Sequence, residues 1–530
     1  MMKLPHIFLS VFIFAGLTGC GSTMDGIGSA LSNMTGSKKH NGFDGRYIDQ
    51  QEVAEFKQRN DALSGEGRLI SYDGLDIPAN QIRQSHVVHS PELNRYLTAI
   101  LDKVIAQWNG TPVNIQVQVI HSQNFAPYAD AYGMISMPLG ALANIESEDE
   151  LALMLAHEVS HIVLRHHERE SVVTDNNDNI NTLSSAFIMA NVIKDSKLDK
   201  DGEDLFAYHP TNHGQKNISK AAIYGGIIQT VSTNVWNTAW KRNQEDEADL
   251  LALDMALAAG YSPRASAHVL QRLADFQGKQ KSLLSKYWKY KKESITSAFQ
   301  SADLSQVNAQ IDSALDEGMN AAIGTVTDYF QRTHMSPENR DLSVREYVRR
   351  EYGDHIRRRV DKQSWQVFSR QESIASLIYS YRQAFAAANA LAENDLASAE
   401  TLAFSALTPE VSGHPYIREV LYNLRMAQNN PVKAAQNLTL ITHWEHASPT
   451  LFDTRIELDM AEQNYAQVLE SIAQAEAVFG NRSRFIVQKS IALTNLGRQQ
   501  EAIAELEQCQ QYMQMKGTCS QLLEKLNRRA

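Results

Sequence analysis

Two histidines and a glutamate form the strongest chemical signal in this sequence. The pentapeptide HEVSH occupies positions 157–161, so that His157 and His161 are four residues apart. On an α-helix such residues project from one face, one turn apart, as two ligands of a tetrahedral ion require. Glu158 is offset by about 100° around the helix and can take a proton from a water beside the ion. The spacing therefore predicts a metal-dependent hydrolase with Glu158 as general base.

A helix must position this pentapeptide, and the stretch 149–170 has the required pattern. Acidic residues at positions 148–150 place negative charge in its first turn. Apolar residues recur at helical spacing, namely Leu151, Leu155, Val159 and Ile162. With 17 histidines in 530 residues, chance would produce the pattern only roughly 0.03 times. We therefore favour a metal site over a buried histidine pair on a core helix.

The third metal ligand distinguishes the classes of HExxH metallopeptidases, and Leu164 excludes the metzincin class. Metzincins have a glycine three residues after the second histidine and another histidine six residues after it. His167 has the right spacing from His161, but Leu164 stands where the glycine would let the chain turn inward. We therefore interpret His166 and His167 as part of a solvated, polar helix end.

A second amphipathic helix, expected over 241–259, offers a better third ligand. It contains EDEAD at 245–249, which has the pattern ExxAD. In this pattern a carboxylate completes the metal site, and the small Ala248 lets the two helices approach each other. Asp249 can accept the N–H of a ligating histidine. The pattern is weak alone but becomes specific 84 residues after an HExxH helix.

HEVSH, EDEAD and the pair Thr333-His334 ahead of Pro337 resemble the metallopeptidase family of HtpX and the CAAX prenyl proteases. The strongest likeness is to its soluble periplasmic branch, which carries C-terminal tetratricopeptide repeats. The resemblance covers roughly residues 60–345, and the repeats extend it to the C-terminus. It implies a zincin-type α+β peptidase core, mainly helical with a small sheet, followed by an all-α solenoid.

The resemblance also assigns roles by motif position. It implies one Zn²⁺ per chain, bound by His157, His161 and Glu245, with Glu158 as the catalytic base. Glu247 is a rival ligand, but it falls in the wrong place relative to the Ala-Asp pair at 248–249. These assignments place the chain among the zinc endopeptidases.

The sequence departs from the family pattern at two places. The usual Thr-His-Pro is here Thr-His-Met-Ser-Pro at 333–337, which leaves the role of His334 open; we expect it to face the metal cleft. A polar insertion at 174–214 separates the two metal helices and is either a lid or a loop. His209 and His213 lie in it and are interpreted as surface histidines.

A small sheet is expected before the first metal helix. Residues 113–120 alternate between apolar and polar, which indicates a strand, and 124–138 resembles a hairpin with a turn near 130–133. In zincins the edge strand beside the HExxH helix pairs with the substrate backbone. The hairpin is therefore either a substrate-docking edge or an ordinary part of the core.

The N-terminus has the pattern of an export signal. Lys3 precedes an apolar run at 7–17, whose 11 residues would reach roughly 16 Å as a helix, half of a hydrocarbon core of about 30 Å. The tetrapeptide LTGC at 17–20 looks like the lipobox of bacterial lipoproteins. That resemblance implies cleavage of the signal before Cys20, acylation of Cys20, and sorting to the outer membrane because Gly21 follows.

From about residue 384 the chain is alanine-rich, amphipathic and periodic. A period of 34 is that of tetratricopeptide repeats, which stack paired helices and offer a concave surface to a protein partner. The consensus Trp and Gly-Tyr residues are absent, so a generic helical bundle is the alternative. The periodic positions are Ala399, Ala434, Val468 and Ala502, with spacings of 35, 34 and 34, and Tyr416, Leu451 and Phe485, with spacings of 35 and 34.

Composition excludes several other classes. The mean hydropathy of -0.36 argues against a polytopic membrane protein, and the net charge of -11 argues against a general nucleic-acid binder. Three cysteines are too few for a disulfide framework. Cys509 and Cys519 form either a bridge that closes a C-terminal hairpin or two free thiols.

Together these observations predict a lipid-anchored zinc endopeptidase of the bacterial periplasm. By resemblance, its task is quality control or assembly of outer-membrane proteins, with misfolded or unassembled outer-membrane proteins as substrates and a protein partner on the repeats. The alternative is a repeat-based assembly factor or chaperone whose metal site is structural or rarely catalytic. The expected segments are a signal peptide (1–20), a flexible tether (21–50), the peptidase domain (51–345), a helical bridge (346–383) and the repeats (384–530).

Overall fold

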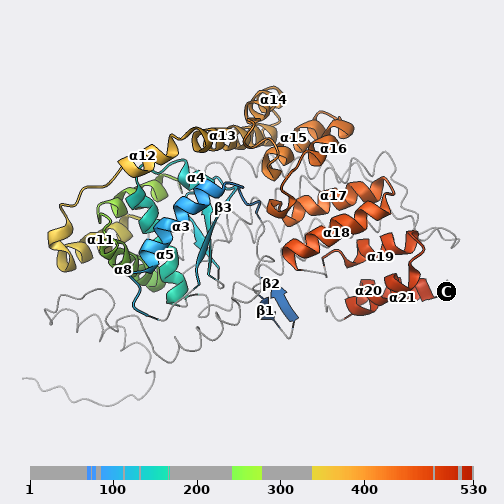
Figure 1. Cartoon of the computed structure of the whole chain (residues 1–530), viewed down its shortest axis with the longest axis horizontal. Helices are drawn as coiled ribbons and strands as arrows, with labels where there is room; N and C mark the ends of the chain where they lie inside the picture. Colours follow the sequence, from blue (N-terminus) through green and yellow to red (C-terminus); the bar gives the residue numbers. More distant parts are fainter. Residues whose placement is uncertain are drawn as a thin grey trace, which may run out of the picture. The chain divides into compact units, whose positions relative to one another are not determined.

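The computed structural model shows an α+β part followed by a long series of helices (Figure 1). It describes residues 69–72, 75–78, 85–110, 114–130, 133–164, 166, 242–276, 337–480, 484–510 and 516–527. These residues are mostly helical, with a three-stranded sheet and a separate hairpin of β1 (Leu69–Tyr72) and β2 (Leu75–Pro78). Within the described part of the chain, no helix combines the length and hydrophobicity needed to cross a membrane.

The three-stranded sheet contains both the predicted strand and the predicted hairpin. Strand β3 (Gln116–Ile120) runs parallel to β5 (Met134–Pro138), with Val117 opposite Ile135. Strand β4 (Tyr128–Ala129) runs antiparallel to β5, which gives the order β3-β5-β4. β4 is therefore an edge strand, and among the described strands it pairs with β5 alone.

The turn between β4 and β5 lies where the sequence places it. The N–H of Asp130 donates to the carbonyl oxygen of Met134, and its Oδ1 accepts from the Met134 N–H, both at 2.9 Å. Gly133 has a φ of +83°, and a Cβ there would lie 2.5 Å from the Asn114 carbonyl oxygen. Glycine thus satisfies both the backbone conformation and the close approach.

Two helices pack on this sheet, and a third packs against both of them. They are α3 (Pro91–Ile105), α5 (Glu148–Val163) and α8 (Arg242–Ala258); the short α4 (Leu139–Leu142) follows β5 directly. Ser90 and Ser147 cap α3 and α5 by accepting a backbone N–H in the first turn. The buried apolar side chains between these elements include Leu93, Leu97, Val119, Ile135, Met137, Leu155, Leu251 and Met255.

Buried carboxylates in the first turn of α5 connect it to later parts of the chain. Asp149 is 3% exposed and accepts the backbone N–H of Ser262 and of Asp361, at 2.5 Å and 2.6 Å. Ser262 follows α8. Asp361 lies after α11 (Pro337–Glu351) and the short η3 (Gly353–His355) and directly before α12 (Gln363–Ser369). The acidic first turn of α5 therefore binds the backbone at Ser262 and Asp361 in addition to complementing the helix dipole.

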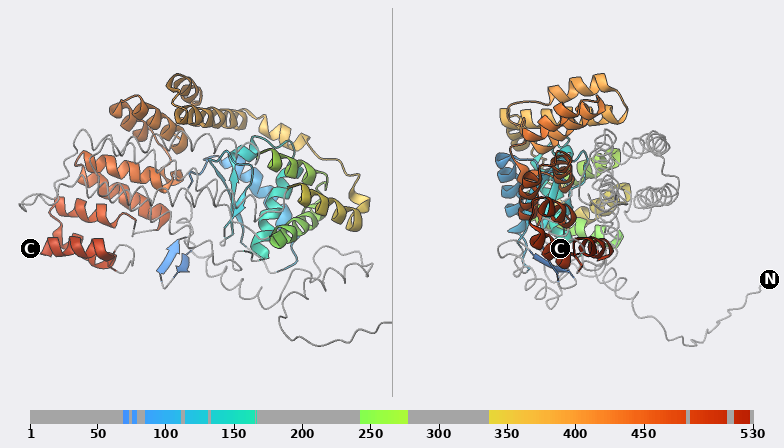
Figure 2. Two further views of the ribbon diagram at one scale, coloured as in Figure 1. Left: turned by 180° about the vertical axis from the view of Figure 1, so that it is seen from behind. Right: turned by 90° about the vertical axis from the view of Figure 1, so that its right-hand side faces the viewer.

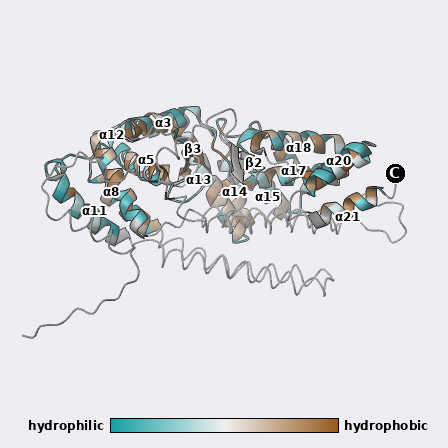
Figure 3. Ribbon diagram, turned by 90° about the horizontal axis from the view of Figure 1, so that it is seen from below, coloured by the Kyte–Doolittle hydropathy of each residue, from teal (hydrophilic) through white to brown (hydrophobic). Residues whose placement is uncertain are grey.

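The C-terminal part consists of helices that pair in sequence order (Figure 2). Many of them carry hydrophilic and hydrophobic residues on different sides (Figure 3). The predicted small residues Ala399, Ala434, Val468 and Ala502 are all fully buried. The helices are α13 (Glu372–Ala392), α14 (Leu396–Ser405), α15 (Pro415–Ala427), α16 (Pro431–Thr439), η4 (Trp444–His446), α17 (Pro449–Ala461), α18 (Tyr465–Phe479), α19 (Ile486–Asn495), α20 (Gln499–Cys509) and α21 (Lys516–Asn527).

One turn geometry recurs between the helices of each pair. Its central residues have φ between 56° and 74° and are spaced by 35, 34 and 34 residues, being Asn394, Asn429, Gln463 and Gly497. The next residue in each case donates its N–H to the carbonyl five positions back, which closes the end of the first helix. The repeat of about 34 residues is thus a property of the backbone as well as of the side chains.

The structure joins Cys509 and Cys519 in a disulfide. Both side chains are fully buried, one at the end of α20 and the other inside α21. Of the two outcomes left open by the sequence, the structure thus contains the bridge that closes the C-terminal hairpin.

Candidate metal centre

Helices α5 and α8 bring together the three residues that sequence motifs proposed as metal ligands. Nε2 of His161 lies 3.0 Å from Nε2 of His157 and 3.6 Å from Oε1 of Glu245. Nε2 of His157 lies 3.7 Å from Oε2 of Glu245. His161 and Glu245 are almost fully buried, whereas the His157 side chain keeps 18% of its surface exposed.

This donor set fits a tetrahedral zinc ion. Bonds of about 2.0–2.2 Å to nitrogen and oxygen at tetrahedral angles place neighbouring donor atoms about 3.3 Å apart. The three observed separations, 3.0, 3.6 and 3.7 Å, bracket that value. Two neutral imidazoles and one carboxylate are a common ligand set of catalytic zinc, and they leave a fourth position for water or substrate.

Asp249 orients the first histidine. Its Oδ1 lies 3.0 Å from Nδ1 of His157, on the side of the ring that faces away from the three-donor cluster. Burial alone would raise the pKa of Asp249, but the charge and hydrogen bonds of Arg340, together with His157, bring it below its ordinary value. The carboxylate is therefore ionised, and its negative charge favours the His157 tautomer that carries the proton on Nδ1, which would leave the Nε2 lone pair for an ion.

Arg340 of α11 completes the site and was not expected from the sequence. Its guanidinium donates two hydrogen bonds to Asp249, at 2.8 and 2.7 Å, and Nη1 lies 2.9 Å from Oε2 of Glu245. The side chain is only 7% exposed. A planar fork that contacts both Glu245 and Asp249 neutralises part of their charge and fixes their orientation.

Glu158 has the environment of a general base. It is 4% exposed, and burial, followed by the charge of nearby Glu245, raises its pKa to about 8 against the opposing effect of His157. The backbone N–H of Ala129, in edge strand β4, hydrogen-bonds its carboxylate. A divalent cation bound beside Glu158 would lower this pKa. The carboxylate thus lies between the donor cluster and edge strand β4.

The position of His166 differs from the prediction. The sequence placed it on a solvated helix end, but its side chain is fully buried, because α5 ends at Val163 and the following turn folds the ring back. Its Nδ1 lies 2.8 Å from Nδ1 of His161, and its Nε2 lies 3.3 Å from Oε2 of Glu247. Glu247 accordingly contacts His166 rather than the three donor atoms, which lie together around Glu245. No signal in the sequence indicated this contact, because residues five positions apart do not share one face of an α-helix.

Several predicted residues lie outside the described part of the chain. These are Cys20, His167, His209, His213, His334, and the segments 1–20, 21–50 and 174–214. The two bridged cysteines belong to α20 and α21 and not to the metal centre.

Residues 91–344 match peptidase family M48, and this range contains every element of the site. Two curated relatives bear the name beta-barrel assembly-enhancing protease. The Vibrio cholerae protein, to which the name is given provisionally, is 25% identical over 191 residues, or 36% of this chain and 34% of the relative. The Yersinia pestis protein is 22% identical over 203 residues, or 38% of this chain and 37% of the relative. The match thus spans about a third of each relative's length.

Proposed function

We propose that this chain, which carries the metallopeptidase domain of family M48, is a lipid-anchored zinc endopeptidase of the bacterial periplasm, attached to the outer membrane. The observation that carries the enzymatic part is the convergence of His157, His161 and Glu245 beside the buried Glu158. The lipobox-like LTGC at 17–20 supports the anchor. The names of the two relatives support a task in quality control or assembly of outer-membrane proteins.

In this proposal the chain's own residues hold the ion and move the protons. His157, His161 and Glu245 would hold Zn²⁺, which supplies Lewis-acid polarisation and lowers the pKa of water when it is bound. Glu158 takes a proton from the attacking water and delivers it to the leaving amine. Asp249 and His166 hold the two imidazoles with their ligating nitrogens turned inward, and Arg340 keeps Asp249 ionised.

The edge strand β4 is the proposed docking site for substrate. β4 contacts α5, and the amide of Ala129 reaches the carboxylate of Glu158. A substrate backbone added beside β4, which has no second partner strand in the part of the chain that the structure describes, would therefore lie across the general base. Misfolded or unassembled outer-membrane proteins would supply such extended segments, and the C-terminal helix pairs would hold a protein partner.

The period of about 34 residues in these helix pairs favours one alternative function. Paired helices of this period commonly serve as docking surfaces. On that view the chain is a repeat-based assembly factor or chaperone, and the metal site is structural or rarely catalytic.

A Glu158→Gln variant tests the proposal against this alternative. The amide keeps the shape of the side chain but cannot accept the water's proton, so cleavage of an unfolded outer-membrane protein should fall by about 10²–10⁴-fold. Zinc content should equal that of the unaltered chain, whereas His157→Ala should lose one zinc ion per chain. Full activity of the Gln variant in cells would refute the peptidase proposal and support the chaperone. Unchanged zinc content in the His157→Ala variant would refute the ligand assignment.

A further inference from the structure

A second group of histidines lies apart from the metal centre. His89, His443 and His446 each offer a ring nitrogen, and these atoms all lie within 4.8 Å of one another. His89 immediately precedes the N-cap of α3, whereas His443 precedes and His446 ends the short η4 between α16 and α17. The cluster therefore joins residues separated by more than 350 positions.

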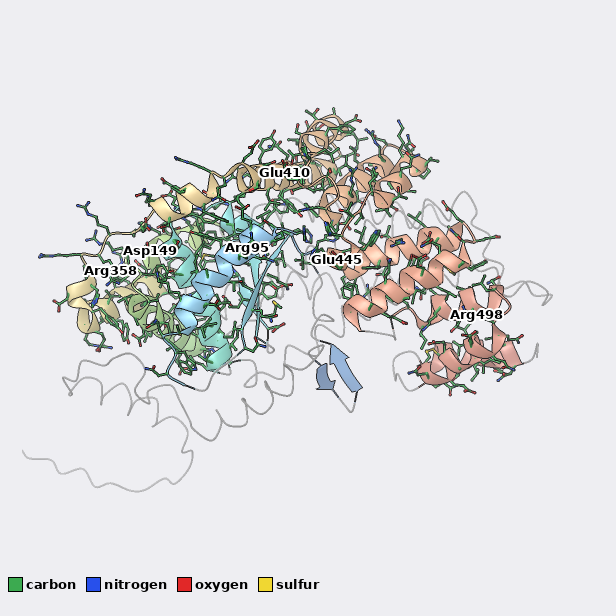
Figure 4. The ribbon with its side chains drawn as sticks, viewed as in Figure 1. Arg95, Asp149, Arg358, Glu410, Glu445 and Arg498 are labelled. Atoms are coloured by element: carbon green, nitrogen blue, oxygen red, sulfur yellow. A yellow bond between two sulfur atoms is a disulfide. The ribbon has the colours of Figure 1, made fainter. Side chains whose placement is uncertain are left out.

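The contacts within the cluster are close. Nδ1 of His89 lies 2.9 Å from Nε2 of His446, and the rings of His89 and His443 stack with their centroids 4.1 Å apart. Glu445, labelled in Figure 4, places Oε1 3.0 Å from Nδ1 of His443 and 3.8 Å from Nε2 of His446. Three imidazoles and one carboxylate thus meet in a space that remains partly open to water.

The backbone holds these residues in place independently of their side chains. The N–H of Val87 donates to the carbonyl oxygen of His446 at 2.9 Å. Nδ1 of the buried His86 accepts the N–H of Ser448 at 2.9 Å, and its Nε2 lies 2.8 Å from Glu419. The backbone segments on both sides of the cluster are therefore held in place, so that binding an ion would require only the imidazole rings to turn.

We propose that His89, His443 and His446 form a second zinc site, with Glu445 as the fourth donor. Imidazole nitrogens suit zinc, and the donor count matches a closed four-coordinate site, which is the arrangement of structural zinc. A ligated ion lies in the plane of each imidazole, so the stacked rings of His89 and His443 turn about their Cβ–Cγ bonds on binding. The bound ion clamps the segment before α3 of the peptidase domain to the loop between α16 and α17. This site does not depend on the proposed peptidase activity.

Zinc content of the full chain tests the proposal. In a His157→Ala/His161→Ala background, which lacks the first site, one zinc ion per chain should remain after dialysis against metal-free buffer. Adding His443→Ala and His446→Ala should remove it. The matched control is His355→Ala, which alters a partly exposed histidine outside both clusters and should leave zinc content unchanged. Absence of zinc from the background protein, or zinc that persists without His443 and His446, would overturn the proposal.

Two further measurements distinguish loss of the zinc site from misfolding of the multiple variants. In the otherwise unaltered chain, a single His443→Gln change should lower the affinity of the weaker zinc site at least tenfold in a competitive chelator titration. Added zinc should raise the thermal midpoint of the double-alanine background, because the ion binds only the folded chain. An unchanged midpoint at saturating zinc, or an unchanged affinity in His443→Gln, would count against the site.

Discussion

At the scale of single residues, the candidate metal centre contains a buried cation beside the three proposed ligands. Arg340 contacts both Glu245 and Asp249, and all three side chains are mostly buried. Without the arginine, two carboxylates would remain in a low-dielectric site with no permanent positive charge. Burial lowers the pKa of Arg340, but the charges of Asp249 and Glu245 outweigh this effect and raise the pKa above its ordinary value.

We therefore expect Arg340→Gln to destabilise the metal-free chain by about 3–5 kcal/mol, the usual cost of breaking a buried ion pair. Urea unfolding in the presence of a chelator would measure this. Arg345→Gln is the matched control on the same helix, because the side chain of Arg345 is 62% exposed whereas that of Arg340 is 7% exposed. That change should cost less than about 1 kcal/mol. Equal losses in the two variants would contradict the role assigned to Arg340.

The sequence predicted residues linked by a local motif and missed residues that reach the site through the fold. His157 and His161 share one helix face, and Glu245 and Asp249 belong to a recognisable pattern, so their convergence was foreseen. Arg340 lies 91 residues beyond Asp249, and no local spacing connects the two. His166 was misplaced because the apolar period suggested a longer helix than the one that ends at Val163.

At the scale of elements, the approach of α5 and α8 sets the distance between the histidines and Glu245. Ala248 is fully buried, three residues after Glu245 on α8. The sequence suggested that its small side chain permits this approach. The strand order β3-β5-β4 and the parallel pairing of β3 with β5, by contrast, could not be deduced from alternation alone, because alternation does not say which strands become neighbours.

Ala248→Leu should separate the two helices and spoil the donor geometry. Overpacking of a dense core costs about 1–3 kcal/mol, so we expect a lower thermal midpoint and at least tenfold weaker zinc binding at the peptidase site. Ala258→Leu, at the exposed end of the same helix, is the control and should change neither quantity. Unchanged zinc affinity in Ala248→Leu would show that the helix spacing is not critical.

At the scale of the whole molecule, one apolar cluster joins the α+β part to the first C-terminal helices, and a second cluster fills the later helix pairs. Val88, ahead of α3, and Leu424, in α15, belong to the same buried set. Polar contacts follow the same path, since His86 hydrogen-bonds Ser448 and Glu419 while its ring lies 4.5 Å from that of His121. The peptidase core and the first helix pairs are therefore coupled energetically, which residue patterns within either part could not indicate.

His121 makes this coupling sensitive to pH. Its Nδ1 accepts the backbone N–H of His86 at 2.9 Å, and its ring lies 4.5 Å from that of Tyr416. Burial, then the neighbouring His86, lowers the pKa of His121 well below 6.5. In the unfolded chain the ring takes up a proton below about pH 6.5, so the unfolded state binds more protons there. Stability should consequently be complete above pH 6.5 and fall as the pH decreases.

A His121→Gln variant isolates this contribution. Below pH 6.5 the unaltered chain should lose stability more steeply than the variant, by up to about 1.4 kcal/mol per pH unit. Urea unfolding at intervals between pH 8 and pH 5 would measure both slopes. The pH 8 values, where the histidine is neutral in both states, give the cost of the substitution itself. Parallel slopes would mean that His121 takes up its proton equally well in the folded chain, so the contact between the peptidase core and the helix pairs would tolerate the charge.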